Sequence, residues 1–177
     1  MARKALLSRP IDCFYFTYFI IHTLITAFVD SATIIPNEYL LDVQSTLLEL
    51  HIEMNNDPLV RNPPAWFVIF VIIEIAFQLP FFVVAAIAFY KDSKQIYVLT
   101  LIYAVNASLT TLACIIEFMY GFQNLSADEF SDEDRTNLVW VYLPTFVIPL
   151  FMMYDMTRRV AVLVASSAAT ERIKKSQ

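Results

Sequence analysis

The sequence predicts an all-α membrane protein in which four transmembrane helices form a bundle and both termini face the cytosol. Hydrophobic residues make up 58% of the 177 residues and charged residues 16%, whereas soluble domains average about 45–50% and about 25%. Four apolar stretches approach or exceed the roughly 20 residues that a helix needs to cross a bilayer. Because backbone polar groups in lipid must pair within their own segment, each stretch is expected to be a helix.

The four expected helices cover residues 11–29, 65–89, 96–118 and 138–154. Ten of the twelve basic residues lie before the first helix, between the second and third, or after the fourth, and the other two are Arg61 and Arg135. Basic loops remain in the cytosol, so we expect a cytosolic segment 1–10, a transmembrane domain 11–160 and a cytosolic tail 161–177. Basic residues that are few and sit at membrane edges argue against nucleic-acid binding.

The tail ends in Lys174-Lys175-Ser176-Gln177, with lysines third and fourth from the end. This resembles the dilysine retrieval signal of endoplasmic-reticulum membrane proteins, and the alternative is a plain basic juxtamembrane tail. We expect a multi-pass protein of the endoplasmic-reticulum membrane, with the nuclear envelope and endolysosomal membranes as further candidate locations. A cleaved signal peptide in place of the first helix is disfavoured, because the apolar run exceeds the usual 7–15 residues.

The link between the first two helices carries an amphipathic pattern. Apolar residues recur there at steps of three and four: Leu40, Val43, Leu47, Leu50 and Met54. This spacing predicts a helix, which either lies in the membrane interface or covers the lumenal mouth of the bundle as a lid.

Ionisable side chains within the predicted spans point to a binding site, because each costs about 2.5–3.5 kcal/mol in the membrane. His22, Thr26 and Asp30 follow one another at intervals of four, so they share one helix face. Glu74 and Gln78 have the same spacing in the second helix. Asn106, Thr110 and Thr145 are expected to form hydrogen bonds between helices.

Asp30 and Glu74 have no Lys or Arg within any span to neutralise them. A buried Glu without a cation favours its neutral form, and a neutral Glu74 could donate a hydrogen bond to an ionised Asp30. Pro80, Pro144 and Pro149 are expected to kink or widen the bundle around this pair. Aromatic residues are available to line the resulting cavity: Phe28, Trp66, Phe70, Phe77 and Tyr142. The pattern predicts an apolar ligand with one hydroxyl group or one cationic amine.

Three motifs resemble one family: Asp57-Pro58-Leu59, Pro63-Pro64-Ala65-Trp66-Phe67 and Glu74-x-x-Phe77-Gln78-Leu79-Pro80-Phe81-Phe82. They are similar to the sigma-2 receptor branch of the EXPERA-domain family, which also contains the emopamil-binding sterol isomerase. The resemblance implies a four-helix fold, often a homodimer, with a sterol-accessible cavity that also binds cationic amphiphiles.

The resemblance also implies roles for single residues. The position of Asp30 engages the ligand amine, that of Glu74 supports it, and Asp57 has a structural role in the lumenal cap. Gln78, Thr111 and Tyr142 match cavity positions. His51 and Thr145 stand where Tyr is expected, and Phe70 replaces the His that isomerase relatives use for acid–base chemistry.

We therefore predict a non-enzymatic protein that binds sterols and cationic amphiphiles and takes part in sterol homeostasis or trafficking. The alternatives are a sterol double-bond isomerase and a tetraspan scaffold or chaperone without a small ligand. The expected partners are the ligand, the bilayer, a second copy and a sterol-transport membrane protein, and no cofactor, metal or catalytic residue is expected. The predicted ligand-binding residues are Asp30, Glu74, Gln78, His22, Thr111, Tyr142, Phe70 and Trp66, and Thr26 joins Asp57 as structural.

Overall fold

The computed structural model describes residues 5–175, apart from the side chains of 170–174. Arg3 and Lys4 of the basic N-terminal segment and the side chain of Lys174 in the proposed retrieval signal lie outside the described residues. Lys175, the other lysine of that signal, is exposed at the end of the last helix.

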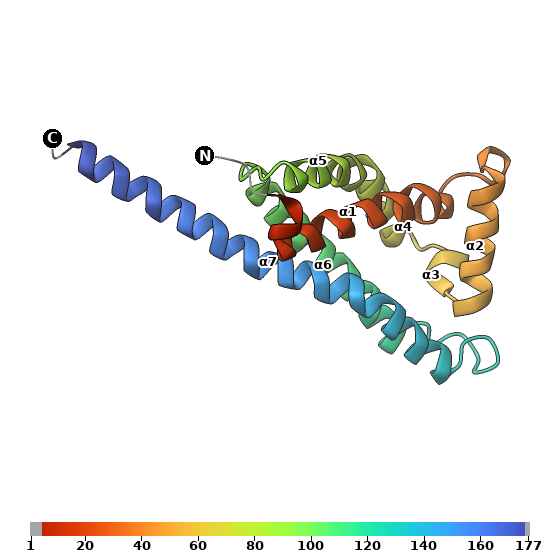
Figure 1. Cartoon of the computed structure of the whole chain (residues 1–177). Helices are drawn as coiled ribbons and strands as arrows, with labels where there is room; N and C mark the ends of the chain where they lie inside the picture. Colours follow the sequence, from red (N-terminus) through yellow and green to blue (C-terminus); the bar gives the residue numbers. More distant parts are fainter. Residues whose placement is uncertain (1–4, 176–177) are drawn as a thin grey trace.

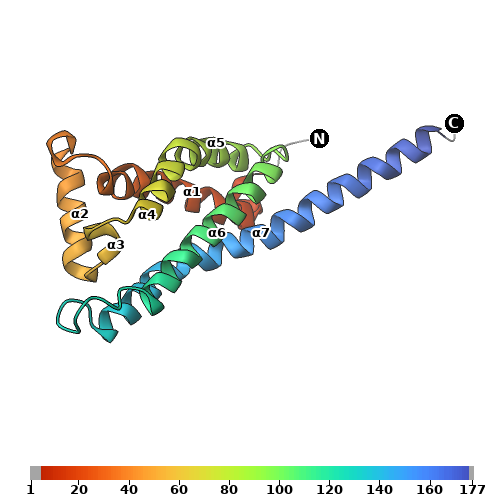
Figure 2. The same cartoon turned by 180° about the vertical axis from the view of Figure 1, so that it is seen from behind.

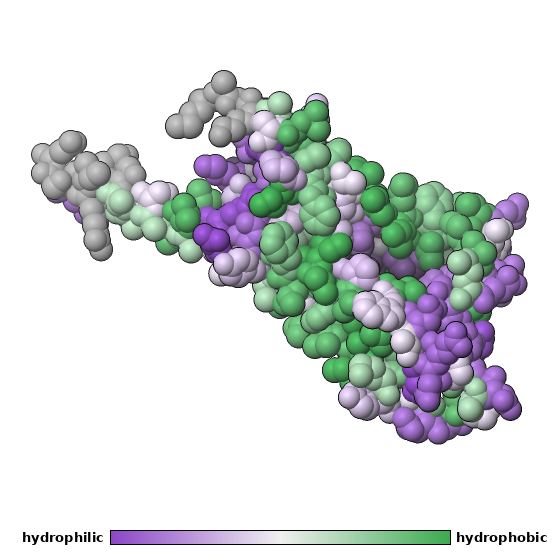
Figure 3. Space-filling model, turned by 60° about the horizontal axis from the view of Figure 1, so that its bottom comes forward, coloured by the Kyte–Doolittle hydropathy of each residue, from purple (hydrophilic) through white to green (hydrophobic). Residues whose placement is uncertain are grey.

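Four apolar helical segments are long enough to cross a membrane, which confirms the predicted spans. The first is α1 (Pro10–Phe28), followed by a 3-10 turn at Asp30–Thr33. The second consists of α4 (Ala65–Ile73), a π-helical segment (Glu74–Gln78) and α5 (Leu79–Tyr90). The third and fourth are α6 (Ile96–Tyr120) and α7 (Asp132–Lys175). Figure 3 shows hydrophobic residues across the middle of the molecule and hydrophilic residues gathered near both ends, as a transmembrane domain requires.

The four segments form two helix pairs. The α1 helix packs along α5, and α6 packs along α7 (Figure 1). The pairs meet at the end that carries both termini, here called the terminal end, and separate towards the opposite, capped end, as both views show (Figure 2). Two further helices lie across the capped end: α2 (Asp42–Asn55) and α3 (Pro58–Arg61). The molecule is therefore a V whose open side is covered by the link between α1 and α4.

Aromatic packing joins the two pairs at the terminal end. The buried ring of Phe19 contacts Phe82 and Phe89 of α5 and Tyr103 of α6, with ring centroids 5.8, 6.0 and 5.4 Å away. Met152 and Met156 of α7 complete this core. The aromatic pairs of Phe19 are tilted, stacked and edge-on, respectively, and aromatic contacts of this kind stabilise packing beyond their buried area.

An ion-pair network lies beside this core. The buried carboxylate of Asp12 accepts hydrogen bonds from Arg9 and, at 2.6 Å, from Arg159 of α7. Arg159 also pairs with Asp155, one turn earlier in α7, at 2.8 Å. The second guanidinium nitrogen of Arg9 donates to the carbonyl of Phe89 at the end of α5, 2.9 Å away. These bonds connect α1, α5 and α7.

Proline affects the second and fourth crossings differently. Pro80 has no N–H, so a carbonyl of the preceding turn loses its α-helical donor. Immediately before it the helix widens into a π turn, in which Leu79 N–H donates to the carbonyl of Glu74. In α7, Pro144 and Pro149 are accommodated within one continuous helix (Figure 1).

The predicted amphipathic helix is α2, and its side chains Gln44 and His51 face the bundle. Gln44 is buried and donates from Nε2 to the Ala27 carbonyl and to Ser31 Oγ, at 3.0 and 3.1 Å. At the other end of α2, Asn56 adopts a left-handed conformation and donates to the Glu129 carbonyl, 3.0 Å away. The helix thus covers the mouth of the bundle as expected of a lid, while the apolar residues Val43, Leu50 and Met54 remain exposed.

The α7 helix is longer than the predicted fourth span. Its 44 residues correspond to roughly 66 Å, about twice the hydrocarbon thickness of a bilayer. It begins at a capping box. The backbone N–H of Ser131 donates to Asp134 Oδ2 at 2.9 Å, and the backbone N–H of Asp134 donates to Ser131 Oγ at 3.1 Å. The α7 helix also continues through the described part of the tail predicted from residue 161.

Candidate ligand-binding site

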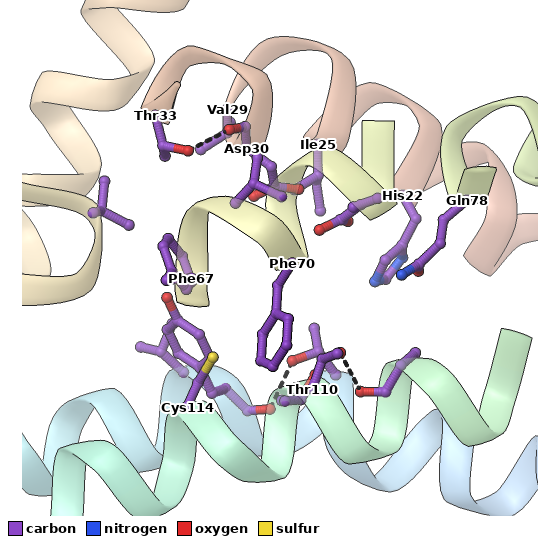
Figure 4. Close-up of a pocket in the computed structure, with 18 of the residues that line it drawn as sticks. His22, Ile25, Val29, Asp30, Thr33, Phe67, Phe70, Gln78, Thr110 and Cys114 are labelled. Carbon is purple, nitrogen blue, oxygen red and sulfur yellow. Dashed lines mark hydrogen bonds between the residues drawn. The ribbon is translucent and has the colours of Figure 1, made fainter. Parts of the chain in front are cut away.

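A cavity of about 320 Å³ lies between the two helix pairs and beneath the cap. This volume is at the lower end of the range typical of small-molecule sites. Seven of the eight residues predicted to bind a ligand line it: His22, Asp30, Phe70, Glu74, Gln78, Thr111 and Tyr142. Figure 4 shows His22, Asp30, Phe70 and Gln78 on one side of the cavity, opposite Thr110 and Cys114 of α6. Their role in binding a ligand stays a prediction.

The most polar part of the wall consists of two carboxyl groups joined by one hydroxyl group. Asp30 follows α1, and Glu74 begins the π-helical segment. The Oγ1 atom of Thr26 lies 3.0 Å from Oδ2 of Asp30 and 2.7 Å from Oε1 of Glu74. No Lys or Arg in the described part of the chain lines the cavity, so this charge is not neutralised from within.

A second polar group lies where the cavity approaches the aromatic core. His22 stacks on the ring of Tyr18 at 3.8 Å, and its Nδ1 is 3.1 Å from the Tyr18 carbonyl oxygen. Because a carbonyl only accepts, Nδ1 carries the hydrogen, and in neutral His22 the other ring nitrogen is then an acceptor. Gln78 donates from Nε2 to Oδ1 of Asn106 across to α6, at 2.9 Å. This end of the cavity therefore also offers an acceptor, the second ring nitrogen of His22.

Sequence analysis missed Tyr18 and Tyr103 in this group. Both residues line the cavity, and their hydroxyl oxygens are 2.8 Å apart. Tyr18 lies four residues before His22, so the polar stripe of α1 extends one turn further than predicted. Tyr103 lies three residues before Asn106 on α6, which is the corresponding signal on that helix.

Behind the cavity wall, the cap carries the fully buried residue Asp57. Its Oδ1 accepts from the backbone N–H groups of Leu59 and Val60, at 2.9 and 3.3 Å, and so caps α3. Its Oδ2 accepts from Tyr142 of α7 at 2.7 Å and lies 3.2 Å from Nε2 of His51 of α2. His51 and Tyr142 both line the cavity. This geometry agrees with a structural role for Asp57, which ties the cap to the fourth crossing.

Several expectations about individual side chains need correction. Trp66 does not line the cavity; its ring packs edge-on against Phe67 and Phe70, at 5.9 and 5.5 Å, and Phe67 is the lining residue instead. Phe28 is also absent from the wall, and Phe77 is 72% exposed on the outside of the bundle.

The predicted hydrogen bonds between helices are realised only in part. Asn106 accepts one from Gln78, as expected. Thr145 instead donates to the carbonyl of Tyr142 in its own helix, at 2.7 Å. Thr110 likewise donates to the Asn106 carbonyl at 3.1 Å. Threonine hydroxyl groups commonly donate to a carbonyl of their own helix in this way. The hydroxyl oxygen can still accept a hydrogen bond from another group.

The described residues contain no group of three or more His, Cys, Asp or Glu side chains arranged to hold a metal ion. The site is an apolar, aromatic chamber whose polar atoms are mainly hydrogen-bond acceptors. Such a wall favours a ligand that brings hydrogen-bond donors or positive charge on an apolar body.

This chain is similar in sequence to known proteins. A family model described as EXPERA (expanded EBP superfamily) matches residues 43–156. The Saccharomyces cerevisiae protein named efficient mitochondria targeting-associated protein 19 is 37% identical over 151 residues, covering 80% of this chain and 94% of the relative. Human sigma intracellular receptor 2 is 34% identical over 149 residues, covering 80% and 84%. The Xenopus tropicalis protein of the same name is 32% identical over 155 residues, covering 86% and 91%.

Proposed function

This chain belongs to the EXPERA family, and from that membership together with the cavity we propose that it is an intracellular membrane receptor for sterols and cationic amphiphiles. Its role would be in sterol homeostasis or trafficking. The observation that carries the proposal is the pair of carboxyl groups, Asp30 and Glu74, bridged by Thr26 on the wall of an apolar cavity.

Charge explains why the cavity would take up a ligand. An ionised carboxylate in a poorly solvated site is costly unless it is paired. No Lys or Arg of the described chain lines the wall, so a ligand ammonium group would supply the missing partner. A sterol hydroxyl group would supply a donor to the same carboxylate, with less electrostatic gain.

The fold offers the ligand a short path from the bilayer. Ile25 of α1 lines the cavity and is 40% exposed. An apolar ligand dissolved in the membrane would enter here and would not need to cross water.

A catalytic role is the second candidate, since two carboxyl groups bridged by a hydroxyl group could move a proton. A sterol double-bond isomerase would use such a transfer. At the position where isomerase relatives carry a His, the cavity wall presents the ring of Phe70, which cannot exchange protons. The names of the relatives, a receptor and a targeting-associated protein, also specify no reaction. Growth and altered sterol products in a complemented isomerase-deficient yeast strain would favour the enzyme.

We further propose that the terminal end faces the cytosol and that the protein resides in the endoplasmic-reticulum membrane, in part as a homodimer. Basic residues of the described chain gather at this end: Arg9, Lys91, Lys94, Arg158 and Arg159. The positive-inside rule supports that orientation, and a cytosolic C-terminus would make a dilysine signal accessible.

The function is tested by ligand binding to purified protein in nanodiscs. We expect saturable binding of a tritiated tertiary amine and saturable crosslinking of a photoreactive sterol, each reduced by unlabelled competitor. Asp30→Asn should weaken amine binding, whereas Asp42→Asn, at an exposed acid of α2, should not. The proposal fails if neither probe saturates on the wild-type protein, or if Asp30→Asn binds both probes unchanged.

A further inference from the structure

Thr26 holds a position that hydrogen-bond geometry constrains strongly. The residue is fully buried, and its hydroxyl oxygen contacts both carboxyl groups of the cavity, at 3.0 and 2.7 Å. Both distances suit O–H···O hydrogen bonds. A hydroxyl group carries one hydrogen and an ionised carboxylate carries none. Two hydrogen bonds therefore require a second hydrogen, which must come from one of the two carboxyl groups.

The geometry favours Glu74 as the carrier of that hydrogen. Glu74 lies near the middle of the second crossing and Asp30 near the end of the first, and a charge is most costly at the centre of the membrane. The hydrogen bonds then run in one direction, from Glu74 to Thr26 and from Thr26 to Asp30. Thr26 is β-branched and restricted in its side-chain rotamers, so the hydroxyl group is held between the two acids. The cluster carries a single negative charge, which resides on Asp30.

The other groups on the cavity wall do not replace this arrangement. His22 approaches from α1 and His51 from α2, and His51 already faces the carboxylate of Asp57. The remaining ionisable groups on the wall are Tyr18, Tyr103, Cys114 and Tyr142, which are neutral in their protonated forms. None of them supplies a permanent positive charge to Asp30.

We propose that Thr26 is a positioning residue that makes this cavity select a protonated amine over a neutral hydroxyl ligand, an inference that rests on the function proposed above. By accepting from Glu74 and donating to Asp30, it keeps exactly one acid ionised and fixes the charge on the cavity wall. Without the hydroxyl group, the hydrogen of Glu74 can pass to Asp30 directly, and the charge is no longer confined to Asp30. Attraction for an ammonium group then decreases much more than hydrogen bonding to a neutral hydroxyl group.

The test compares Thr26→Val with Thr26→Ser, because valine keeps the shape and serine keeps the hydroxyl group. The probes are a tritiated arylalkyl tertiary amine and a tritiated sterol with a single hydroxyl group, bound to the full chain in nanodiscs. We expect Thr26→Val to lose about tenfold or more in amine affinity, the scale of a hydrogen bond to a charged group. Sterol affinity should change by less than about threefold, and Thr26→Ser should restore amine binding.

The outcomes separate this inference from the proposed function. If Thr26→Val lost equal affinity for both probes, the role of Thr26 would be purely structural and the inference would be overturned. Unchanged amine affinity in Thr26→Val, or a loss of amine affinity in Thr26→Ser, would overturn it as well. If neither probe binds the wild-type protein, the proposed function itself is wrong.

A second measurement does not depend on the folding of Thr26→Val. Infrared spectra of the wild-type protein should contain the carbonyl band of one protonated carboxyl group that disappears in Glu74→Gln and persists in Asp30→Asn. A wild-type spectrum without a band that depends on Glu74 would contradict the proposed direction of the hydrogen bonds, whatever the ligand results.

Discussion

At the scale of single residues, Asp30 and Glu74 both carry a carboxyl group, but their proposed hydrogen-bonding roles towards Thr26 differ. Asp30 ends the polar stripe of α1 and Glu74 begins the π-helical segment, and the Thr26 hydroxyl group contacts both carboxyl groups. In the arrangement proposed above, this hydroxyl group accepts the hydrogen of Glu74 and donates its own to Asp30. The two acids should therefore respond differently to neutralisation.

Asp30→Asn should weaken binding of a tertiary amine by about tenfold to a hundredfold, the range for losing a hydrogen bond to a charged group. Glu74→Gln should weaken it less, because the glutamine amide can still donate to Thr26. Competition binding on the two variants checks the order. Equal losses would show that the two acids share the charge.

Asp57→Asn should destabilise the protein by roughly 1–3 kcal/mol, the cost of leaving buried polar groups without partners. The amide retains one acceptor for the N-terminus of α3 but turns an NH₂ group towards the Tyr142 hydroxyl and His51, which both donate to Asp57. Thermal unfolding in detergent should show a clear fall in Tm. Asp42→Asn, at an exposed acid of α2, is the matched control, and a normal Tm in Asp57→Asn would remove the structural role assigned here.

Residue-level sequence reasoning worked for polar side chains and worked poorly for aromatic ones. His22, Asp30, Glu74 and Gln78 all line the cavity as predicted, because burying them against lipid is costly. Trp66 and Phe77 do not line it. Lipid is as favourable for an aromatic ring as a protein interior is, so an apolar residue carries little information about which way it faces.

At the scale of elements, two features position the site: the π turn of the second crossing and the polar network at the terminal end. The π turn sets the direction in which Glu74 and Gln78 point, and π turns frequently occur at functional sites. The network fixes the point from which the two helix pairs diverge.

Pro80→Ala should reduce binding of both amine and sterol while leaving Tm unchanged or higher. Alanine restores the missing N–H and favours regular α-helix through this segment, which rotates Glu74 relative to Gln78. Binding and thermal unfolding are measured on the same preparation. Normal binding in this variant would show that the π turn does not set the geometry of the site.

Asp12→Asn should destabilise the protein by about 3 kcal/mol or more, because removing one partner of a buried ion pair leaves charges without compensation. The variant leaves Arg9 and Arg159 facing a neutral amide at the junction of α1 and α7. Detergent or chemical unfolding provides the measurement, and Arg158→Gln, at an exposed position, serves as control. A change as small as that of the control would mean that the aromatic core alone holds the junction.

At the scale of the whole molecule, the number and the positions of the spans were predictable, whereas the length of α7 and the V-shaped arrangement were not. Apolar length defines a span without reference to its neighbours. The pairing of α1 with α5 and of α6 with α7 depends on side-chain fit between helices whose outer and inner faces are both apolar. The cavity was inferred from unpaired charge, and its position between two pairs could only come from the structure.

The proposed orientation predicts which end can be labelled from the cytosol. In a background of Cys13→Ser and Cys114→Ser, Ser93→Cys should react with a membrane-impermeant maleimide on sealed microsomes. Asp128→Cys, in the link between α6 and α7, should react only after permeabilisation. Labelling of the two positions in the opposite order would invert the topology.

The capped end bridges the gap between the two helix pairs through separate hydrogen bonds. Gln44 holds α2 to the end of α1, and Asp57 holds the same cap to Tyr142 of α7. The cap therefore limits how far the two helix pairs can separate at this end. Under the proposed function, a narrow ligand would leave these hydrogen bonds intact and a wider one would have to break them, so the cap would select ligands by width in addition to charge.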